Sequence, residues 1–243
     1  MPSPSRQKLP PATLVLFVRH GTTPTTGQVL PGRARGLHLA ESGRTQAEAV
    51  ATRLAEWTGG PVSASPPTKG AGRGPGRSRR APRRPAVTGV YASPLERTRE
   101  TAAPIARALG LPVTAERGLL ECDFGAWTGA ALSDLAKRPE WATVQRYPSG
   151  FSFPGGESFA GMQRRMIETV SALCARHRGE TIVAVSHADP IKAVVADAVG
   201  THLDLFQRIV ISPCSVTAIS YGSTGPTVLA VNSTGSLGEL RPS

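Results

Sequence analysis

The sequence predicts an α/β fold, a three-layer sandwich in which helices cover both faces of a mostly parallel sheet. Two observations lead to this prediction. Short apolar runs rich in β-branched residues alternate along the chain with longer segments whose apolar residues recur at helical spacing. Strands that are separated by helices usually pair in parallel, and a parallel sheet needs helices on both faces because both faces are apolar.

In the first half of the chain, apolar runs indicate strands, and apolar residues three or four positions apart indicate helices. Ser42 is the expected N-cap of the first helix, because its hydroxyl can accept a hydrogen bond from a free backbone N–H. Gly110 is expected to end the second helix, because glycine readily adopts the left-handed conformation. We therefore expect strands at Leu14–Val18, 89–94 and 111–116, and helices at 41–57 and 95–110.

The second half repeats the alternation. An amphipathic pattern that includes Phe159, Met166 and Val170 predicts a helix, and the apolar run before His187 predicts a buried strand. Two β-rich runs near the C-terminus predict a hairpin close to the edge of the sheet. We expect helices at 158–177 and 190–200, and strands at 181–187, 215–222 and 226–232.

The domain organisation follows from composition. We expect residues 14–240 to form a single domain, preceded by a flexible N-terminus at 1–13. Residues 58–88 contain seven Lys and Arg residues and no acid, among many Pro, Gly and Ser residues, and predict a disordered insertion. Without those seven cations the net charge of +11 falls to +4. A basic arm that holds polyanions weakly is the alternative, but no aromatic residue there could stack on bases.

Composition excludes several classes of protein. Hydrophobic residues make up 40% of the chain, which suits a packed core, yet no apolar run is long enough for a membrane helix. The apolar run near the N-terminus lacks a small-residue cleavage site, so we expect a strand and not a secretion signal. Three scattered cysteines favour neither a disulfide framework nor a zinc site, and they suit a reducing cytoplasm.

Ionisable side chains follow three of the predicted strands. Arg19 and His20 end the first strand, Arg97 lies in the first turn of the helix after the second, and His187 ends another. Each feature alone also fits a structural histidine or a solvated helix face. Because open α/β sheets bind ligands beyond the carboxyl ends of their strands, we expect these four side chains to surround one anion, with Gly21 allowing its close approach.

These segments resemble the histidine phosphatase superfamily, which includes phosphoglycerate mutases and many phosphatases. The resemblance rests on the order and spacing of several motifs and spans nearly all of the chain outside the first dozen residues and the basic insertion. The amino-acid sequences of these motifs most resemble those of an actinobacterial subgroup described as phosphomutases or phosphatases. The motifs are FVRHGTT, GRARGLHLAESGRTQA, VYASPLERTRETA, LLECDFGAWTG, FPGGESFAGMQRRM, VAVSHADPIKAV and VNSTGSL.

The resemblance implies a phosphoglycerate mutase-like fold and a role for each matching residue. His20 would be the nucleophile that becomes phosphohistidine, and Arg19, Arg97 and a protonated His187 would complete the phosphate pocket. Glu121 would donate the proton to the leaving group, and burial beside aromatic residues would raise its pKa for that task. Further candidates for holding phosphate or substrate are Thr22, Thr23, Thr26 and Arg33.

These roles predict a phosphatase that hydrolyses small phosphomonoesters, with no cofactor and no metal. A phosphomutase is the alternative, and a non-catalytic binder of phosphorylated ligands or polyanions is less favoured. A mutase must grip a bisphosphate and exclude water, which needs additional cations. The segment between Glu121 and His187 offers Lys137, Arg138 and Arg146, but no adjacent arginine pair before PGGES. We therefore favour hydrolysis.

Overall fold

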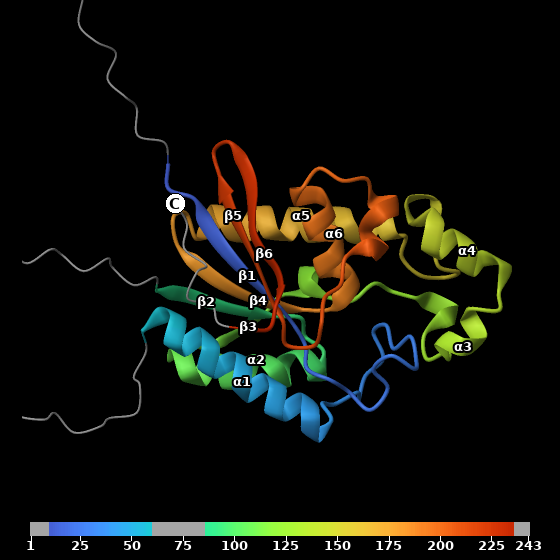
Figure 1. The fold of residues 1–243 in the computed structure, drawn as a ribbon, viewed down its shortest axis with the longest axis horizontal. Coiled ribbons are helices and arrows are strands. Elements are labelled where there is room, and N and C mark those ends of the chain that lie inside the picture. The colour runs from blue at the N-terminus through green and yellow to red at the C-terminus, as the bar shows by residue number, and fades with distance from the viewer. Residues whose placement is uncertain (1–9, 60–85, 236–243) are drawn as a thin grey trace, which may run out of the picture.

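The computed structural model describes residues 10–59 and 86–235. Its central layer is a six-stranded sheet with the order β3-β2-β4-β1-β5-β6 (Figure 1). The first four strands in that order are parallel, and the last two form an antiparallel hairpin at one edge. The strands are β1 (Thr13–Arg19), β2 (Val87–Ala92), β3 (Val113–Ala115), β4 (Thr181–Ser186), β5 (Val216–Gly222) and β6 (Gly225–Ser233). The predicted α/β class and the hairpin at the edge are confirmed.

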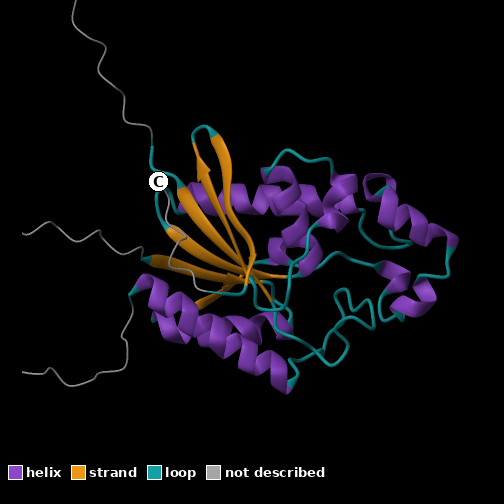
Figure 2. Cartoon of the chain, in the orientation of Figure 1, coloured by secondary structure: helices purple, strands orange, loops and turns teal. Residues whose placement is uncertain are grey.

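Helices form the outer two layers (Figure 2). Helices α1 (Glu41–Thr58) and α2 (Glu96–Leu109) cover one face of the sheet, and α5 (Phe159–Arg176) and α6 (Ala188–Ala198) cover the other. The short helices α3 (Leu132–Leu135) and α4 (Pro139–Arg146) lie beyond the end of the sheet (Figure 1). Single turns of 3-10 helix occupy Arg117–Leu119, Gly125–Trp127 and Pro148–Gly150, and a longer one occupies Leu203–Arg208.

Strand β1 is apolar throughout because both of its faces are covered. Leu14, Leu16 and Val18 pack in the core under α1 and α2, whereas Val15 and Phe17 pack in the core under α5 and α6. All five are at most 2% exposed. A strand buried on both sides has no polar face, which explains why the sequence reads as a continuous apolar run without alternation.

A third core lies past the end of the sheet and is rich in aromatic rings. Phe153 makes edge-on contacts with Phe124, Phe151 and Phe159, with ring centroids 4.8 to 5.2 Å apart. Trp127 packs against the same group. This aromatic core joins the region of α3 and α4 to the start of α5.

Two details of the helix ends test the sequence analysis. Ser42 is not the N-cap of α1, because the helix begins at Glu41 and Ala40 occupies the cap position without a side-chain hydrogen bond. The backbone of this first turn packs directly on the loop before it, because a Cβ at Gly43 would lie 2.0 Å from the carbonyl oxygen of Thr22. Gly110 does end α2 in the left-handed conformation, with φ of 68°.

The expected domain boundaries fall partly outside the described residues. Thr13 is the first residue of β1 and is buried, so it is not part of a flexible N-terminus, and the expectation for residues 1–9 concerns residues outside the described part of the chain. Thr58 is the last residue of α1, and Val87 is the first residue of β2. The expected insertion at 58–88 therefore overlaps regular structure at both of its ends. The expected disorder concerns residues 60–85, which lie outside the described part of the chain. Within the described residues, no helix is long and apolar enough to cross a membrane.

Candidate active site

Three neighbouring parallel strands deliver their next residues to one place. β1 and β4 pair so that Arg19 lies opposite Ser186, and the backbone N–H of His20 donates to the carbonyl of Ser186 at 3.0 Å. Beyond β2, the N–H of Ser93 donates to the carbonyl of Val185, also at 3.0 Å. His20, Ser93 and His187 therefore lie side by side at the carboxyl ends of the strands, as predicted for the two histidines.

The imidazole of His20 presents one free nitrogen. Nδ1 lies 2.8 Å from the carbonyl oxygen of Gly21, and because a carbonyl can only accept, Nδ1 must carry the proton. Nε2 of the neutral ring then keeps its lone pair. Burial, with the nearby charges of Arg97 and Arg19, lowers the pKa of His20 well below 6.5, so the nucleophilic form is favoured at neutral pH.

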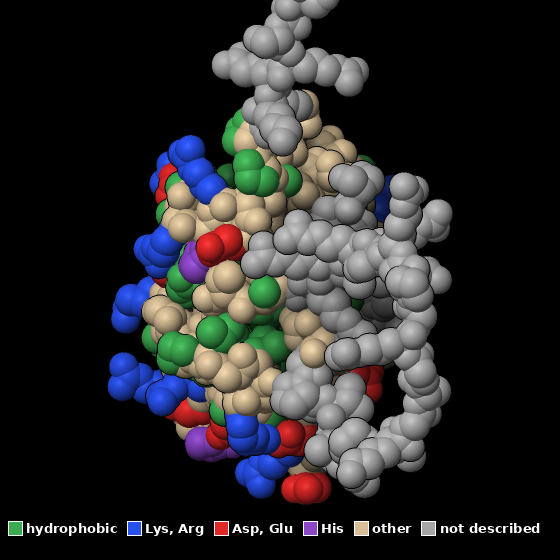
Figure 3. All heavy atoms as spheres, turned by 90° about the vertical axis from the view of Figure 1, so that its left-hand side faces the viewer, with side chains coloured by type: hydrophobic (Ala, Val, Ile, Leu, Met, Phe, Trp, Pro, Cys, Tyr) green, Lys and Arg blue, Asp and Glu red, His purple; other side chains and the backbone are tan. Residues whose placement is uncertain are grey.

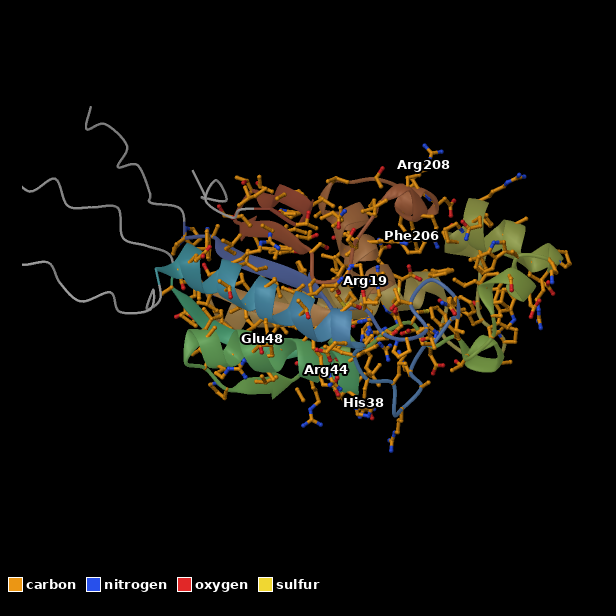
Figure 4. All side chains as sticks on the ribbon, turned by 60° about the horizontal axis from the view of Figure 1, so that its bottom comes forward. Arg19, His38, Arg44, Glu48, Phe206 and Arg208 are labelled. Atoms are coloured by element: carbon orange, nitrogen blue, oxygen red, sulfur yellow. The ribbon has the colours of Figure 1, made fainter. Side chains whose placement is uncertain are left out.

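Arg97 is fully buried, Arg19 is half-buried, and both guanidinium groups are only partly hydrogen-bonded. Arg19 donates through Nη1 to the carbonyl of Ile211 at 2.6 Å, and Arg97 donates through Nη2 to the carbonyl of Gly32 at 2.7 Å. Arg19 Nε and both Arg97 Nε and Nη1 are buried without a partner. Burial lowers the pKa of both guanidinium groups, and Glu121 acts against it. In Figure 4, Arg19 lies among the helices and strands, whereas His38 and Arg208 lie at the periphery and are exposed.

His187 completes the group from the other side. Its ring lies edge-on to that of His20, with centroids 5.2 Å apart, and its Nε2 lies 2.9 Å from Ser93 Oγ. Its Nδ1 is buried without a hydrogen-bond partner. Burial, then Arg97, lowers its pKa well below 6.5, so the ligand-free site favours a neutral ring and not the protonated one that we expected. A Ser93 hydroxyl that donates to Nε2 leaves the single proton on Nδ1, where a neutral ring can still donate to an anion.

Glu121 is a buried carboxyl beside this group. It is 7% exposed, and its Oε2 lies 4.0 Å from His187 Nδ1. Its pKa is raised to about 7, mainly by burial and then by the charge of Asp189, although Arg97 acts in the opposite direction. The backbone of Glu121 is fixed by Arg33, whose Nε donates to its carbonyl at 2.9 Å. A carboxyl with this pKa can hold a proton near neutral pH.

A cavity of about 420 Å³ opens beside these groups. Arg19, His20 and Glu121 are among the residues that line it. Phe153 and Trp141 belong to its apolar wall, together with residues of α3, α4 and the segment 209–211. The sequence left open whether Phe151, Phe153 and Trp141 form a wall or core. Phe153 does both, Trp141 lines the cavity, and Phe151 belongs to the aromatic core.

The further candidate residues divide into two groups. Thr23 and Thr26 line the cavity, and their hydroxyls lie 2.9 Å apart. Thr22 does not line it, because its hydroxyl donates to Gln46 at 3.0 Å. Arg33 lies behind Glu121, where it binds Glu157 Oε2 at 3.0 Å and borders a separate pocket. The structure thus brings Thr23 and Thr26 to the site, and a direct substrate contact by Thr22 or Arg33 stays a prediction.

Gly21 serves a different purpose from the one expected. A Cβ at this position would lie 2.5 Å from the carbonyl oxygen of Gly43, and a Cβ at Gly43 would lie 2.0 Å from that of Thr22. The two glycines therefore allow the His20 loop to pack directly on the first turn of α1. Close approach is required, as predicted, but by helix backbone and not by an anion.

Sequence reasoning missed four residues of the site. Ser93 was interpreted only as part of a turn, although it follows a strand in the same way as the two histidines do. Asp189, Lys192 and Gln207 line the same cavity as Arg19. The position of Asp189 two residues after His187, at the start of a helix, was the available signal. Gln207 comes from a distant segment and gave none.

Within residues 10–59 and 86–235, no group of three or more His, Cys, Asp or Glu side chains is placed to hold a metal ion.

Comparisons with known proteins agree with this geometry. The family model of the histidine phosphatase superfamily (branch 1) matches residues 15–68 and 78–234. The chain is 34% identical over 157 residues to bifunctional protein Rv2228c of Mycobacterium tuberculosis (strain ATCC 25618 / H37Rv), covering 64% of this chain and 43% of that protein. It is 33% identical over 153 residues to phosphoserine phosphatase 1 of Hydrogenobacter thermophilus, covering 62% and 72%.

Solved structures share the fold. The native structure of a mycobacterial glucosyl-3-phosphoglycerate phosphatase superposes with a TM-score of 0.73 at 22% identity, covering 92% of this chain and 100% of that one. The chain spans less than half the length of the mycobacterial bifunctional protein. Since the family model matches most of the chain, including the residues that surround His20, the chain belongs to the histidine phosphatase superfamily.

Proposed function

We propose that this chain hydrolyses phosphomonoesters through a phosphohistidine on His20. One observation carries the proposal: buried N–H donors of Arg19, Arg97 and His187 have no partner in the protein and surround a histidine with a free Nε2. An unpaired buried donor is costly, and several together indicate a ligand that supplies acceptors. A phosphate dianion offers oxygen acceptors and the charge that balances two guanidinium groups.

The proposed chemistry has two steps. His20 Nε2 attacks phosphorus, the bond from phosphorus to the ester oxygen breaks, and Glu121 gives its proton to the departing alkoxide. Water then attacks the phosphohistidine, Glu121 takes a proton from that water, and the P–N bond breaks to release inorganic phosphate. In both steps the charge on the transferring group stays between Arg19, Arg97 and the Nδ1–H of His187.

Hydrolysis is favoured over transfer to a second phosphorylated alcohol by the charge of the cavity. Among the described residues that line it, the cations are Arg19 and Lys192. Arg19 belongs to the phosphate cluster, by which we mean Arg19, His20, Arg97 and His187. Lys192 is neutralised by Asp189, whose Oδ1 lies 3.2 Å from its Nζ. If a bisphosphate bound here, its second phosphate would find no unpaired cation among the described residues that line the cavity. The name of the 33% identical relative, a phosphoserine phosphatase, points in the same direction.

The test is to incubate the protein with 3-phosphoglycerate, with and without 2,3-bisphosphoglycerate, and to follow both inorganic phosphate and 2-phosphoglycerate. We expect phosphate release from at least one compound in a wider set of phosphorylated metabolites, and no 2-phosphoglycerate. Formation of 2-phosphoglycerate that depends on the bisphosphate would establish the mutase instead. Full inhibition by EDTA would contradict the metal-independent mechanism.

Two further expectations belong to this proposal. The three cysteines are free, which supports action in a reducing cytoplasm. The basic segment is expected to be peripheral to catalysis. Replacing residues 60–85 by a short Gly-Ser linker should leave phosphate release intact and should abolish any binding to a polyanion such as heparin. Loss of hydrolysis in this variant would show that the segment takes part in the reaction.

A further inference from the structure

The cavity also contains a polar group made by Lys192, Asp189 and Gln207. Lys192 Nζ donates to Asp189 Oδ1 at 3.2 Å and to Gln207 Oε1 at 3.1 Å. The side chains of Lys192 and Asp189 are only 16% and 17% exposed. The ammonium also lies 5.8 Å from the centre of the Phe206 ring. The mechanism proposed above uses none of these contacts, although all three polar residues line the cavity.

This polar group has one donor and one acceptor without a hydrogen-bond partner among the described residues. An ammonium has three N–H donors, and two of those on Lys192 are taken by protein oxygens. Within the described residues, Asp189 Oδ2 accepts no hydrogen bond. The wall therefore presents one charged donor and one charged acceptor close together. Two adjacent hydroxyls satisfy both, because one oxygen can accept from Lys192 while the other hydroxyl donates to Asp189.

Charge argues against an anionic group at this place. Asp189 and Lys192 cancel each other, and the next acidic group, Glu121, lines the same cavity. A carboxylate or second phosphate could accept from Lys192 but would face the carboxylate of Asp189 at short range. In a partly buried site such a like-charge contact is poorly screened. The polar group thus suits a neutral ligand better than an acid.

The apolar side chains that line the same cavity suit the rest of such a molecule. Trp141 lines the cavity and stacks on Trp127, with ring centroids 6.4 Å apart. Leu30, Leu132 and Ile209 add aliphatic surface. A carbon chain or ring that carries hydroxyls on one side has C–H groups on the other, and these groups pack favourably against an indole face.

We propose that Lys192 and Asp189 are specificity residues, and that they select phosphomonoesters of neutral polyols, such as glycerol or sugar phosphates, by binding two adjacent hydroxyls of the leaving alcohol. This inference rests on the proposed function and adds the substrate class to it. The phosphate cluster would bind any phosphomonoester, whereas the Lys192–Asp189 pair would distinguish the alcohols.

Three compounds with the same three-carbon chain provide the test. Glycerol 3-phosphate carries two adjacent hydroxyls, n-propyl phosphate carries none, and 3-phosphoglycerate has a carboxylate in place of the terminal hydroxymethyl group. We expect kcat/KM to be about 10- to 100-fold higher for glycerol 3-phosphate than for propyl phosphate, which is the size of effect that hydrogen bonds to charged groups produce. It should also exceed the value for 3-phosphoglycerate.

Variants assign the preference to the pair. Lys192→Met should remove most of the preference in kcat/KM for glycerol 3-phosphate over propyl phosphate. The rate of each variant with propyl phosphate corrects for any general loss of activity. Asp189→Asn should raise kcat/KM for 3-phosphoglycerate relative to that for glycerol 3-phosphate, because the charge that repels the carboxylate is gone. Lys137→Met is the matched control, since Lys137 pairs with Asp134 at the same spacing and a similar distance of 2.9 Å on an exposed surface. Lys192→Arg should keep part of the ratio.

The outcomes separate this inference from the proposed function. If none of the three compounds nor p-nitrophenyl phosphate is hydrolysed in a His20-dependent manner, the proposed function is wrong. If they are hydrolysed but glycerol and propyl phosphate are equivalent, or 3-phosphoglycerate is preferred, only the substrate class is wrong. A ratio that survives both Lys192→Met and Asp189→Asn would also overturn the inference. Either variant alone suffices if the other does not fold.

Discussion

Each end of the sheet holds a histidine, half-buried at one end and fully buried at the other, and the two differ in how their ring nitrogens are used. At the end where β4 begins, His177 Nε2 lies 2.7 Å from the Tyr91 hydroxyl, and Nδ1 lies 2.8 Å from Glu180 Oε2. Figure 3 views the molecule from this end, where Lys and Arg side chains line one rim of the face. At the other end, His187 has one partnered and one unpartnered nitrogen, and the neighbouring arginines are also incomplete.

This difference separates a structural histidine from one in a binding site. Both rings lie next to strands, and both have a hydroxyl partner, so position and neighbours alone do not distinguish them. Buried polar groups in folded proteins are nearly always satisfied. The cluster around His177 meets that rule within the protein, whereas the cluster around His20 meets it only with a ligand. The first should matter for stability and the second for turnover.

The largest effect should come from His20. Replacing it by Ala removes the atom that bonds to phosphorus, so hydrolysis of p-nitrophenyl phosphate should fall to background, a loss on the order of 10⁴-fold or more. Steady-state assays measure the loss, and circular dichroism checks the fold. Residual turnover within tenfold of the native rate would mean that another group is the nucleophile.

Glu121→Gln should come next, and its effect should depend on the leaving group. Alkyl phosphates need a proton on the departing oxygen, and general acid catalysis contributes roughly 10²- to 10⁴-fold, so propyl phosphate should lose about that much. Aryl phosphates have better leaving groups and should lose much less. Comparing kcat/KM for propyl and p-nitrophenyl phosphate measures the difference, and equal losses for both would remove Glu121 from the role of acid.

The pH dependence gives a smaller but directional effect. Glu121 has a pKa of about 7 and must be protonated to act as the acid, so kcat/KM for propyl phosphate should fall as the pH rises through that value. Asp189 helps to raise this pKa, and Asp189→Asn should therefore move the decline to lower pH. His20, whose pKa lies well below 6.5, should not limit activity until more acidic pH. If the decline of kcat/KM at high pH is unchanged in Asp189→Asn, the charge of Asp189 does not affect the pKa of Glu121.

The smallest effect on turnover should come from the satisfied end of the sheet. His177→Ala removes the 2.7 Å partner of the buried Tyr91 hydroxyl and leaves it only the Arg176 Nη1 donor at 3.4 Å, which should cost about 1 to 3 kcal/mol of unfolding free energy. Urea unfolding followed by fluorescence measures it. The kcat/KM for p-nitrophenyl phosphate should stay unchanged. A variant that loses activity without losing stability would contradict the distinction between the two ends.

The sequence was sufficient for the fold and for the centre of the site, because both depend on local signals. Periodicity located the strands, and a charged residue directly after a buried strand must lie at its carboxyl end, which placed Arg19, His20 and His187. Contacts between distant segments gave no local signal. The bond between Ser93 and His187 and the contact of Lys192 with Gln207 depend on how strands and helices pack.

The same reasoning explains the errors. Gly21 was correctly expected to allow a close approach, but only the position of α1 shows that Gly43 is the neighbour. His187 was expected to be protonated, but its pKa is lowered, first by burial and then by the charges of Arg97 and His20. Ser42 has a side chain that suits an N-cap, yet the helix begins one residue earlier.

A crystal structure with orthovanadate would test the central claim most directly. We expect vanadium bonded to His20 Nε2, with its oxygens within hydrogen-bond distance of Arg19 Nε, Arg97 Nε and Nη1, and His187 Nδ1. Those are the buried donors that have no partner in the protein. Vanadate bound elsewhere, or bound to His20 while these donors turn to other partners, would contradict the account.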